Sequence, residues 1–166
     1  MGTKKYRLTG NHINIGNRIL YQIEALKDFG NVKAGDLGGY IESEENLSQY
    51  DNAWVYGDAQ VFDNARVYGN ALVYNDAYVF GNAQVYGDAQ IKSARDYIVF
   101  KNWWSSGRYF TWTRSNNMWK VGCFYGTGEE LIKKAYNDSE ISGREYERIV
   151  RYVEEILEEN YGNKED

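Results

Sequence analysis

The sequence predicts a mainly β protein: a short parallel β-helix of hexapeptide repeats, with a β-hairpin cap before it and a small α+β domain after it. Three observations predict this fold. A six-residue pattern repeats through the middle of the chain, strand-like apolar patterns flank it, and two segments with helical signals follow towards the C-terminus. The chain has 166 residues, 17 glycines and no proline, so its turns depend on Gly, Asn and Asp.

Seven consecutive hexads run from Asn52 to Ser93, within a predicted repeat domain of residues 52–94. Each hexad has Asn or Asp first, Ala second and Val or Ile fourth. Because Ala and Val are two residues apart, they point to the same side of a short strand, and we predict that both columns form the core. Gly, Asn or Asp ends each of the first six hexads, where a corner requires positive φ.

This pattern resembles the hexapeptide repeat of left-handed parallel β-helices. In that family three hexads form one triangular coil, which implies that residues 18 apart stack at the strand spacing of about 4.8 Å. Seven hexads then form roughly 2.3 coils. The implied outward aromatic ladders are Tyr56 over Tyr74, Phe62 over Phe80, and Tyr68 over Tyr86.

The three predicted faces of the coil differ in their outward residues. The first face presents Trp54, Tyr56, Leu72 and Tyr74, whereas the third presents Arg66, Tyr68, Gln84 and Tyr86. An exposed apolar face usually marks an interface. The first face is therefore the predicted oligomer interface, and the trimeric habit of the resembled family implies a homotrimer.

Residues 1–51 are predicted to form the N-terminal hairpin and an irregular first coil. Lys5–Leu8 and Arg18–Leu26 have the composition of strands, and the polar stretch Thr9–Asn17 is the predicted hairpin loop. The first coil is expected to begin near Gly38, because Ile41, Leu47 and Ala53 are six residues apart. The stretch Lys5–Gln49, followed at once by hexads, resembles uncharacterised bacterial and phage hexapeptide-repeat proteins of a transferase-like group, and its segment 28–49 carries the resemblance.

Residues 95–166 are predicted to form a β-β-β-α-α domain. The expected strands are Tyr97–Phe100, Arg108–Arg114 and Met118–Tyr125, with a hairpin turn at Ser115–Asn117. Capping boxes at Thr127–Glu130 and Ser142–Glu145 predict two helix starts, and Gly162 is the predicted end of the second helix. The run from Asp96 to Glu130 resembles a domain of phage and prophage proteins of unknown function.

Charge is unevenly distributed along the chain, whose net charge is −5. Residues 95–121 carry five basic and one acidic side chain, whereas residues 129–166 carry six basic and twelve acidic ones. We therefore expect no generic nucleic-acid binding, although a local anion site in 95–121 remains open. No signal peptide or membrane span is recognisable, so a cytoplasmic protein without a membrane partner is expected.

The most site-like cluster lies in this basic segment and consists of Trp103, Trp104, Arg108, Trp112, Arg114 and Lys120. Aromatic faces and cationic groups together can hold a base and a phosphate. The predicted partner is a small anionic ligand such as a nucleotide, or alternatively a host protein. In a second interpretation these aromatic residues form the domain core. Trp103 and Trp104 are adjacent, so they cannot both point inward from a strand.

Few residues support a catalytic or metal-binding role. The acyltransferases among hexapeptide proteins rely on a histidine base, whereas the hexads contain none and His12 lies in the predicted hairpin loop. Cys123 is expected to be buried and inert. A corner role explains Asp58, Asp76 and Asp88 better than calcium binding, because Asn fills the same position in other hexads. We expect no catalytic residue, no metal and no cofactor.

Three functions remain open from the sequence. The favoured one is a non-catalytic oligomeric binding protein, encoded by a phage or prophage, that sequesters a host ligand or blocks a host defence protein. The phage association follows only from the resemblance. The alternatives are an acyltransferase-like enzyme and a structural spacer or capping protein. The first is favoured because an aromatic, locally basic cluster occurs on an oligomerising scaffold that lacks catalytic groups.

Overall fold

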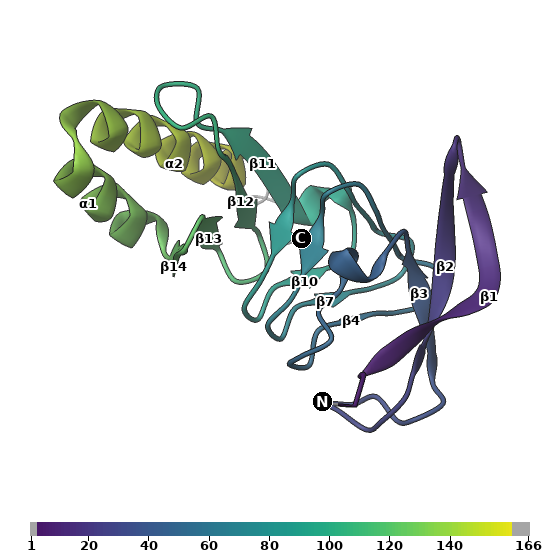
Figure 1. The fold of residues 1–166 in the computed structure, drawn as a ribbon. Helices are drawn as coiled ribbons and strands as arrows, with labels where there is room; N and C mark the ends of the chain where they lie inside the picture. Colours follow the sequence, from purple (N-terminus) through teal and green to yellow (C-terminus); the bar gives the residue numbers. More distant parts are fainter. Residues whose placement is uncertain (1–2, 161–166) are drawn as a thin grey trace.

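The computed structural model describes residues 3–160. The chain runs from an N-terminal hairpin, through a stack of short coils, to a sheet and two helices at the other end (Figure 1). Among the described residues, no helix combines the length and apolar character that a membrane span requires.

The coils are built from seven strands of two residues each, at the third and fourth positions of the hexads. They are β4 (Trp54–Val55), β5 (Gln60–Val61), β6 (Arg66–Val67), β7 (Leu72–Val73), β8 (Tyr78–Val79), β9 (Gln84–Val85) and β10 (Gln90–Ile91). Strands of successive coils pair in parallel between residues 18 apart, as β4–β7–β10, β5–β8 and β6–β9. The mainly β class and the solenoid repeat are therefore confirmed.

The columns and corners of the repeat occupy the predicted positions. All Val, Ile and Ala rungs of the hexads are buried in one core. The six corner residues have φ between 57° and 67°, which Gly, Asn and Asp tolerate best: Gly57, Asp63, Gly69, Asn75, Gly81 and Gly87. The outward rings stack along the faces, with centroids 5.0 Å apart for Tyr56–Tyr74 and 5.3 Å apart for Phe62–Phe80.

The N-terminal hairpin is longer than predicted, and its loop is shorter. Strands β1 (Tyr6–Ile15) and β2 (Arg18–Ala25) pair almost to the turn at residues 16–17, with an irregularity between Leu8 and His12. The predicted nine-residue loop is therefore wrong, and His12 lies on a strand. Polar residues are accommodated there because most of this half of β1 is exposed, so its side chains need not be apolar.

Strand β3 (Leu37–Ile41) joins the hairpin to the solenoid in a sheet of order β1-β2-β3-β5-β8. Ile41 pairs with Val61 and Leu47 with Val67, a spacing of 20 residues instead of 18. The first coil is therefore irregular because two extra residues follow the 3-10 helix η1 (Glu44–Asn46). This insertion forms the loop Ser48–Asp51.

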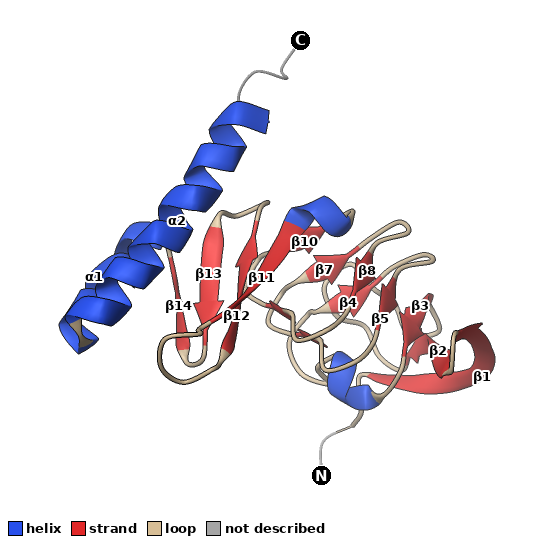
Figure 2. Ribbon diagram, turned by 90° about the horizontal axis from the view of Figure 1, so that it is seen from above, coloured by secondary structure: helices blue, strands red, loops and turns tan. Residues whose placement is uncertain are grey.

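The C-terminal part is an antiparallel sheet with two helices. After the 3-10 helix η2 (Ala94–Asp96), the strands lie in the order β11 (Tyr97–Lys101), β12 (Tyr109–Thr113), β13 (Met118–Val121) and β14 (Phe124–Gly126), followed by α1 (Gly128–Asp138) and α2 (Glu140–Asn160). Figure 2 shows this sheet between the helices and the coils. Its helix-facing side contributes Phe110, Trp112 and Trp119 to a second hydrophobic core.

Two boundaries of this part differ from the sequence prediction. The expected strand 118–125 is interrupted by a turn at Gly122 and Cys123, where Gly122 has φ of 56°. Helix α2 begins at Glu140, before the predicted capping box, because the Oγ of Ser139 accepts the N–H of Ser142. Gly162, the predicted helix end, lies outside the described residues.

Hydroxyl groups from the C-terminal sheet bind the last open strands of the coils. Thr111 Oγ1 accepts the backbone N–H of Gln84 at 2.9 Å, and Ser115 Oγ accepts that of Gln90 at 2.8 Å. Tyr97 donates its hydroxyl to the Tyr78 carbonyl at 2.9 Å. Each of β8, β9 and β10 thereby has a partner at the edge where the coils end.

Candidate functional site

The predicted aromatic and basic cluster is divided among several places. Trp112 is 1% exposed and packs in the second core, with its Nε1–H donated to Asn117. This corrects its assignment to a ligand-contacting surface: alternate β12 residues face the helices, so a large ring there becomes core. The alternative interpretation, in which the aromatics form the core of the domain, holds for Trp112.

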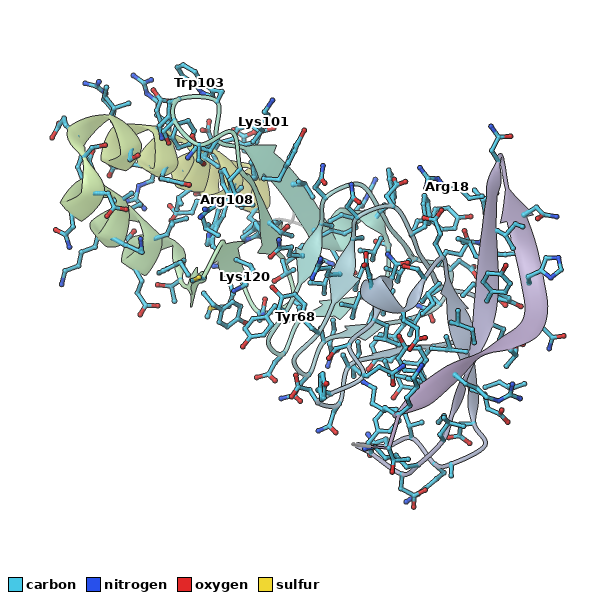
Figure 3. The ribbon with its side chains drawn as sticks, in the orientation of Figure 1. Arg18, Tyr68, Lys101, Trp103, Arg108 and Lys120 are labelled. Carbon is cyan, nitrogen blue, oxygen red and sulfur yellow. The ribbon has the colours of Figure 1, made fainter. Side chains whose placement is uncertain are left out.

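Trp103 and Trp104 lie in the loop before β12, on the side of the helices. Trp104 donates its Nε1–H to Ser142 at 3.1 Å and packs edge-on against Tyr146. Trp103 is 71% exposed and points away from the body of the molecule (Figure 3). One of the adjacent tryptophans is therefore available to a partner, whereas the other holds the loop on α2.

Arg114 has a structural partner and lies apart from Arg108. Its guanidinium binds the carboxylate of Asp96 at 2.8 Å, and that carboxylate is buried. An unpaired buried charge is costly, so Arg114 has a structural role as the partner of the Asp96 carboxylate. Arg108 and Arg114 flank opposite ends of β12, which corrects their assignment to one cluster.

Lys120 lies where the C-terminal sheet meets the third face of the coils, close to Tyr68 (Figure 3). Its amino group is 4.9 Å from the ring centroid of Tyr86 and 6.0 Å from that of Tyr68. Burial lowers the pKa of Lys120, and burial raises the pKa of Tyr68 to about 12. This cation–π contact attaches the sheet to the solenoid.

A groove crosses the third face beside this junction, and we call it the third-face groove. It consists of two adjoining hollows of about 630 Å³ and about 330 Å³, which share Glu45, Arg66 and Gln84. The loop 44–50 lines one end. Arg108 and Tyr109 from the C-terminal sheet line the other. Arg108 also borders a separate cavity of about 270 Å³ beside the helices.

Three carboxylates (Glu44, Glu45 and Asp63) and two arginines (Arg66 and Arg108) line the groove, and two of the carboxylates have partners outside it. Glu44 is held by Lys4 at 3.1 Å, which keeps the pKa of Glu44 below its usual range, and Asp63 is paired with Arg18. Among the described residues, Arg66 and Arg108 form no ion pair with a carboxylate, and Glu45 is the remaining acidic side chain of the lining. Arg66 and Arg108 are therefore the cations of the lining that have no carboxylate partner among the described residues.

The predicted oligomer interface is changed at one residue. Trp54 is only 1% exposed, because Tyr6 and Phe29 pack edge-on against its ring. Trp54 therefore belongs to the core, which corrects its assignment to an accessible interface. Tyr56, Leu72 and Tyr74 remain partly exposed on the first face.

The remaining polar candidates are dispersed. His12 is exposed on β1, at the opposite end of the molecule from the helices. Cys123 is exposed, so the prediction of a buried cysteine is wrong. It lies in the turn between β13 and β14, outside the paired residues of the sheet. Within residues 3–160, no three His, Cys, Asp or Glu side chains converge as a metal site would require.

Sequence reasoning missed the contribution of the loop 44–50 to the groove. The repeat predicted that Arg66, Tyr68 and Gln84 share one outward face, and register pairs Arg66 with Gln84. The loop covers part of that face because of its two-residue insertion. The break in the six-residue spacing between Leu47 and Val55 was the signal that could have revealed it.

Comparisons with known proteins agree with the repeat. The model of the YdcK β-solenoid repeat matches residues 59–75 and 65–81. The chain is also 48% identical over 40 residues to a protein of Escherichia coli K12 named uncharacterized acetyltransferase YdcK. Those residues are 24% of this chain and 12% of that relative, so the likeness covers a small part of either protein.

Proposed function

We propose that this protein is a non-catalytic oligomeric binding protein that captures a small anionic ligand in the third-face groove. The observation that carries the proposal is that two arginines, Arg66 and Arg108, line the groove without an ion pair to any described carboxylate. A cation left unpaired in a concave polar site is suited to an external anion. A host protein with an acidic segment is the alternative occupant.

An acyltransferase-like enzyme is the second candidate, favoured by the name of the E. coli relative. Against it, His12 lies on the N-terminal hairpin, whereas the groove lies against the C-terminal sheet. A general base must come within hydrogen-bonding reach of the proton that it removes. A structural spacer is the third candidate, and the hydroxyl contacts at the coil edge would suit it.

Further parts of the proposal rest on the sequence patterns or on resemblance. They are the left-handed sense of the coils, the capping role of the hairpin, the division into domains at residues 51 and 94, the origin in a phage or prophage, and action in the host cytoplasm. Sequestering a host signal or blocking a host defence protein would be the biological purpose of the groove.

We propose further that the protein forms a homotrimer through the first face. The stacked rings of Tyr56 and Tyr74, with Leu72 beside them, are the partly exposed apolar side chains that support this. Sedimentation velocity should give three times the 19.3 kDa chain mass, and Leu72→Glu should shift it towards monomer. A monomer of the unaltered chain at micromolar concentration would contradict the trimer.

Calorimetric titration with pyrophosphate, a small polyanionic probe, tests the groove. We expect binding that weakens by about tenfold or more in Arg66→Gln and in Arg108→Gln, since each loses a charged hydrogen bond. Arg95→Gln removes an exposed charge outside the groove and should bind normally. Release of CoA from acetyl-CoA by the unaltered chain, abolished in His12→Ala, would favour the enzyme instead.

A further inference from the structure

We infer that the ligand of the third-face groove is a nucleotide, with its base on Tyr50 and its phosphates between Arg66 and Arg108. This inference rests on the proposed function and specifies its ligand. It follows from the different chemistry of the two hollows. The larger one has the exposed ring of Tyr50, and Arg108 lines only the smaller one. Arg66 lines both, and Tyr109 lines the smaller one.

Tyr50 combines an exposed side chain with a fixed backbone. The residue is 79% exposed, yet its carbonyl accepts the Nζ–H of the buried Lys5 at 3.1 Å. Lys5 also binds the Ala53 carbonyl at 2.6 Å, and Gln49 Oε1 accepts the backbone N–H groups of Lys5 and Tyr6. Because the loop is already ordered, stacking a base on this ring costs little further conformational entropy.

Exposed aromatic rings on fixed backbones are the usual platforms for bases. A base stacks on such a ring whatever its identity, because every base has a π-face. Tyr68 lies in the same hollow, and its hydroxyl donates to Gln84 Oε1 at 3.1 Å. That bond leaves the Nε2 donors of Gln84 for a base edge or a ribose hydroxyl.

The smaller hollow has the donors that phosphates require. Arg66 and Arg108 line it, and the Arg108 guanidinium lies beside Gly122. Guanidinium groups bind phosphate oxygens in a bidentate manner. Asn64 and Asn82 line the same hollow and add amide donors. Glu45 is the opposing charge, so its neutralisation should strengthen binding.

Calorimetric titrations with ADP, adenosine and pyrophosphate distinguish the two ends of the groove. We expect ADP to bind more tightly than pyrophosphate. Tyr50→Ala should weaken ADP binding about 5- to 150-fold, the range for loss of one base stack, and leave pyrophosphate binding unchanged. Tyr78→Ala removes a tyrosine that is 48% exposed on another face and should leave both affinities unchanged.

Charge variants test the phosphate end with the same probes. Arg108→Gln should weaken ADP and pyrophosphate alike, and Glu45→Gln should strengthen both about two- to fivefold. Two results would overturn the nucleotide inference but leave the anion-binding function standing. One is ADP binding no more tightly than pyrophosphate, and the other is ADP binding that Tyr50→Ala does not weaken. Failure of both ADP and pyrophosphate to bind would overturn the nucleotide together with the anion groove.

Discussion

Val79 and Tyr78 are neighbours on β8 with opposite environments: Val79 is fully buried, whereas Tyr78 is 48% exposed. We predict that Val79→Asp lowers the free energy of unfolding by more than about 3 kcal/mol, because an unpaired carboxylate would enter the apolar column. Tyr78→Asp should change it by about 1 kcal/mol or less. Urea unfolding measures both, and equal losses would mean that the assigned inward register is incorrect.

Cys123 is exposed at the turn after β13. We predict that a thiol reagent such as Ellman's labels the folded protein at a rate within about tenfold of the urea-unfolded chain, because access to the thiol is not limited by unfolding. Stopped-flow absorbance follows the reaction. Labelling that requires denaturant would place the thiol in the interior, and Cys123→Ser gives the reagent blank.

At the scale of the element, β3 depends on its two glycines. A Cβ at Gly39 would lie 2.5 Å from the Ala59 carbonyl oxygen and 2.7 Å from a Val55 methyl group. Because a backbone carbonyl cannot move aside, we predict that Gly39→Ala destabilises the protein by about 2 kcal/mol or more. Gly10→Ala is the control, since Gly10 has open space around it and should tolerate the methyl group. Thermal unfolding of both variants tests the close approach.

The contact of β12 with β9 includes a hydrogen bond to the Thr111 hydroxyl group. Thr111 is fully buried, and it accepts the Gln84 N–H. Thr111→Val keeps the shape of the side chain but leaves that N–H unpaired, which we predict costs about 1–3 kcal/mol. Hydrogen exchange at the Gln84 amide should accelerate in Thr111→Val and remain slower in Thr111→Ser, which keeps the acceptor. Equal exchange in the two variants would show that the hydroxyl does not protect this edge.

At the scale of the whole molecule, partly buried tyrosines link stability to high pH. Burial raises the pKa of Tyr68 to about 12 from an unfolded value of 10.0, and it also raises the pKa values of Tyr97, Tyr125 and Tyr146. The unfolded chain therefore loses these protons first. The stabilisation is complete below pH 10 and is lost as pH rises towards 12.

We predict that the urea midpoint falls between pH 10 and pH 12. In Tyr68→Phe, which has no proton to lose at this position, the fall should be smaller. A midpoint that does not change over this range would contradict the link between burial and titration.

Some site residues could be found from the sequence, and others could not. Arg66, Tyr68 and Gln84 were assigned to one face because the six-residue period determines which side each residue occupies. Trp54 obeys the same period yet is buried, because Tyr6 and Phe29 come from segments about 25 to 50 residues earlier and cover it. The spacing of residues within the repeat cannot predict that side chains from distant segments will cover one of its outward positions. The loop that holds Tyr50 was missed for the same reason.

The repeat, its corners and its ladders follow from the sequence, because each depends on residues that recur at intervals of 6 and 18. Within such a pattern, equivalent positions of successive hexads all point inward or all point outward. A wrong assignment at one position therefore does not change the assignment of the others. The groove depends on contacts between the solenoid and its two non-repeating flanks, the loop 44–50 and the sheet that carries Arg108. Those contacts arise from the packing of side chains distant in the chain, and no periodicity encodes that packing.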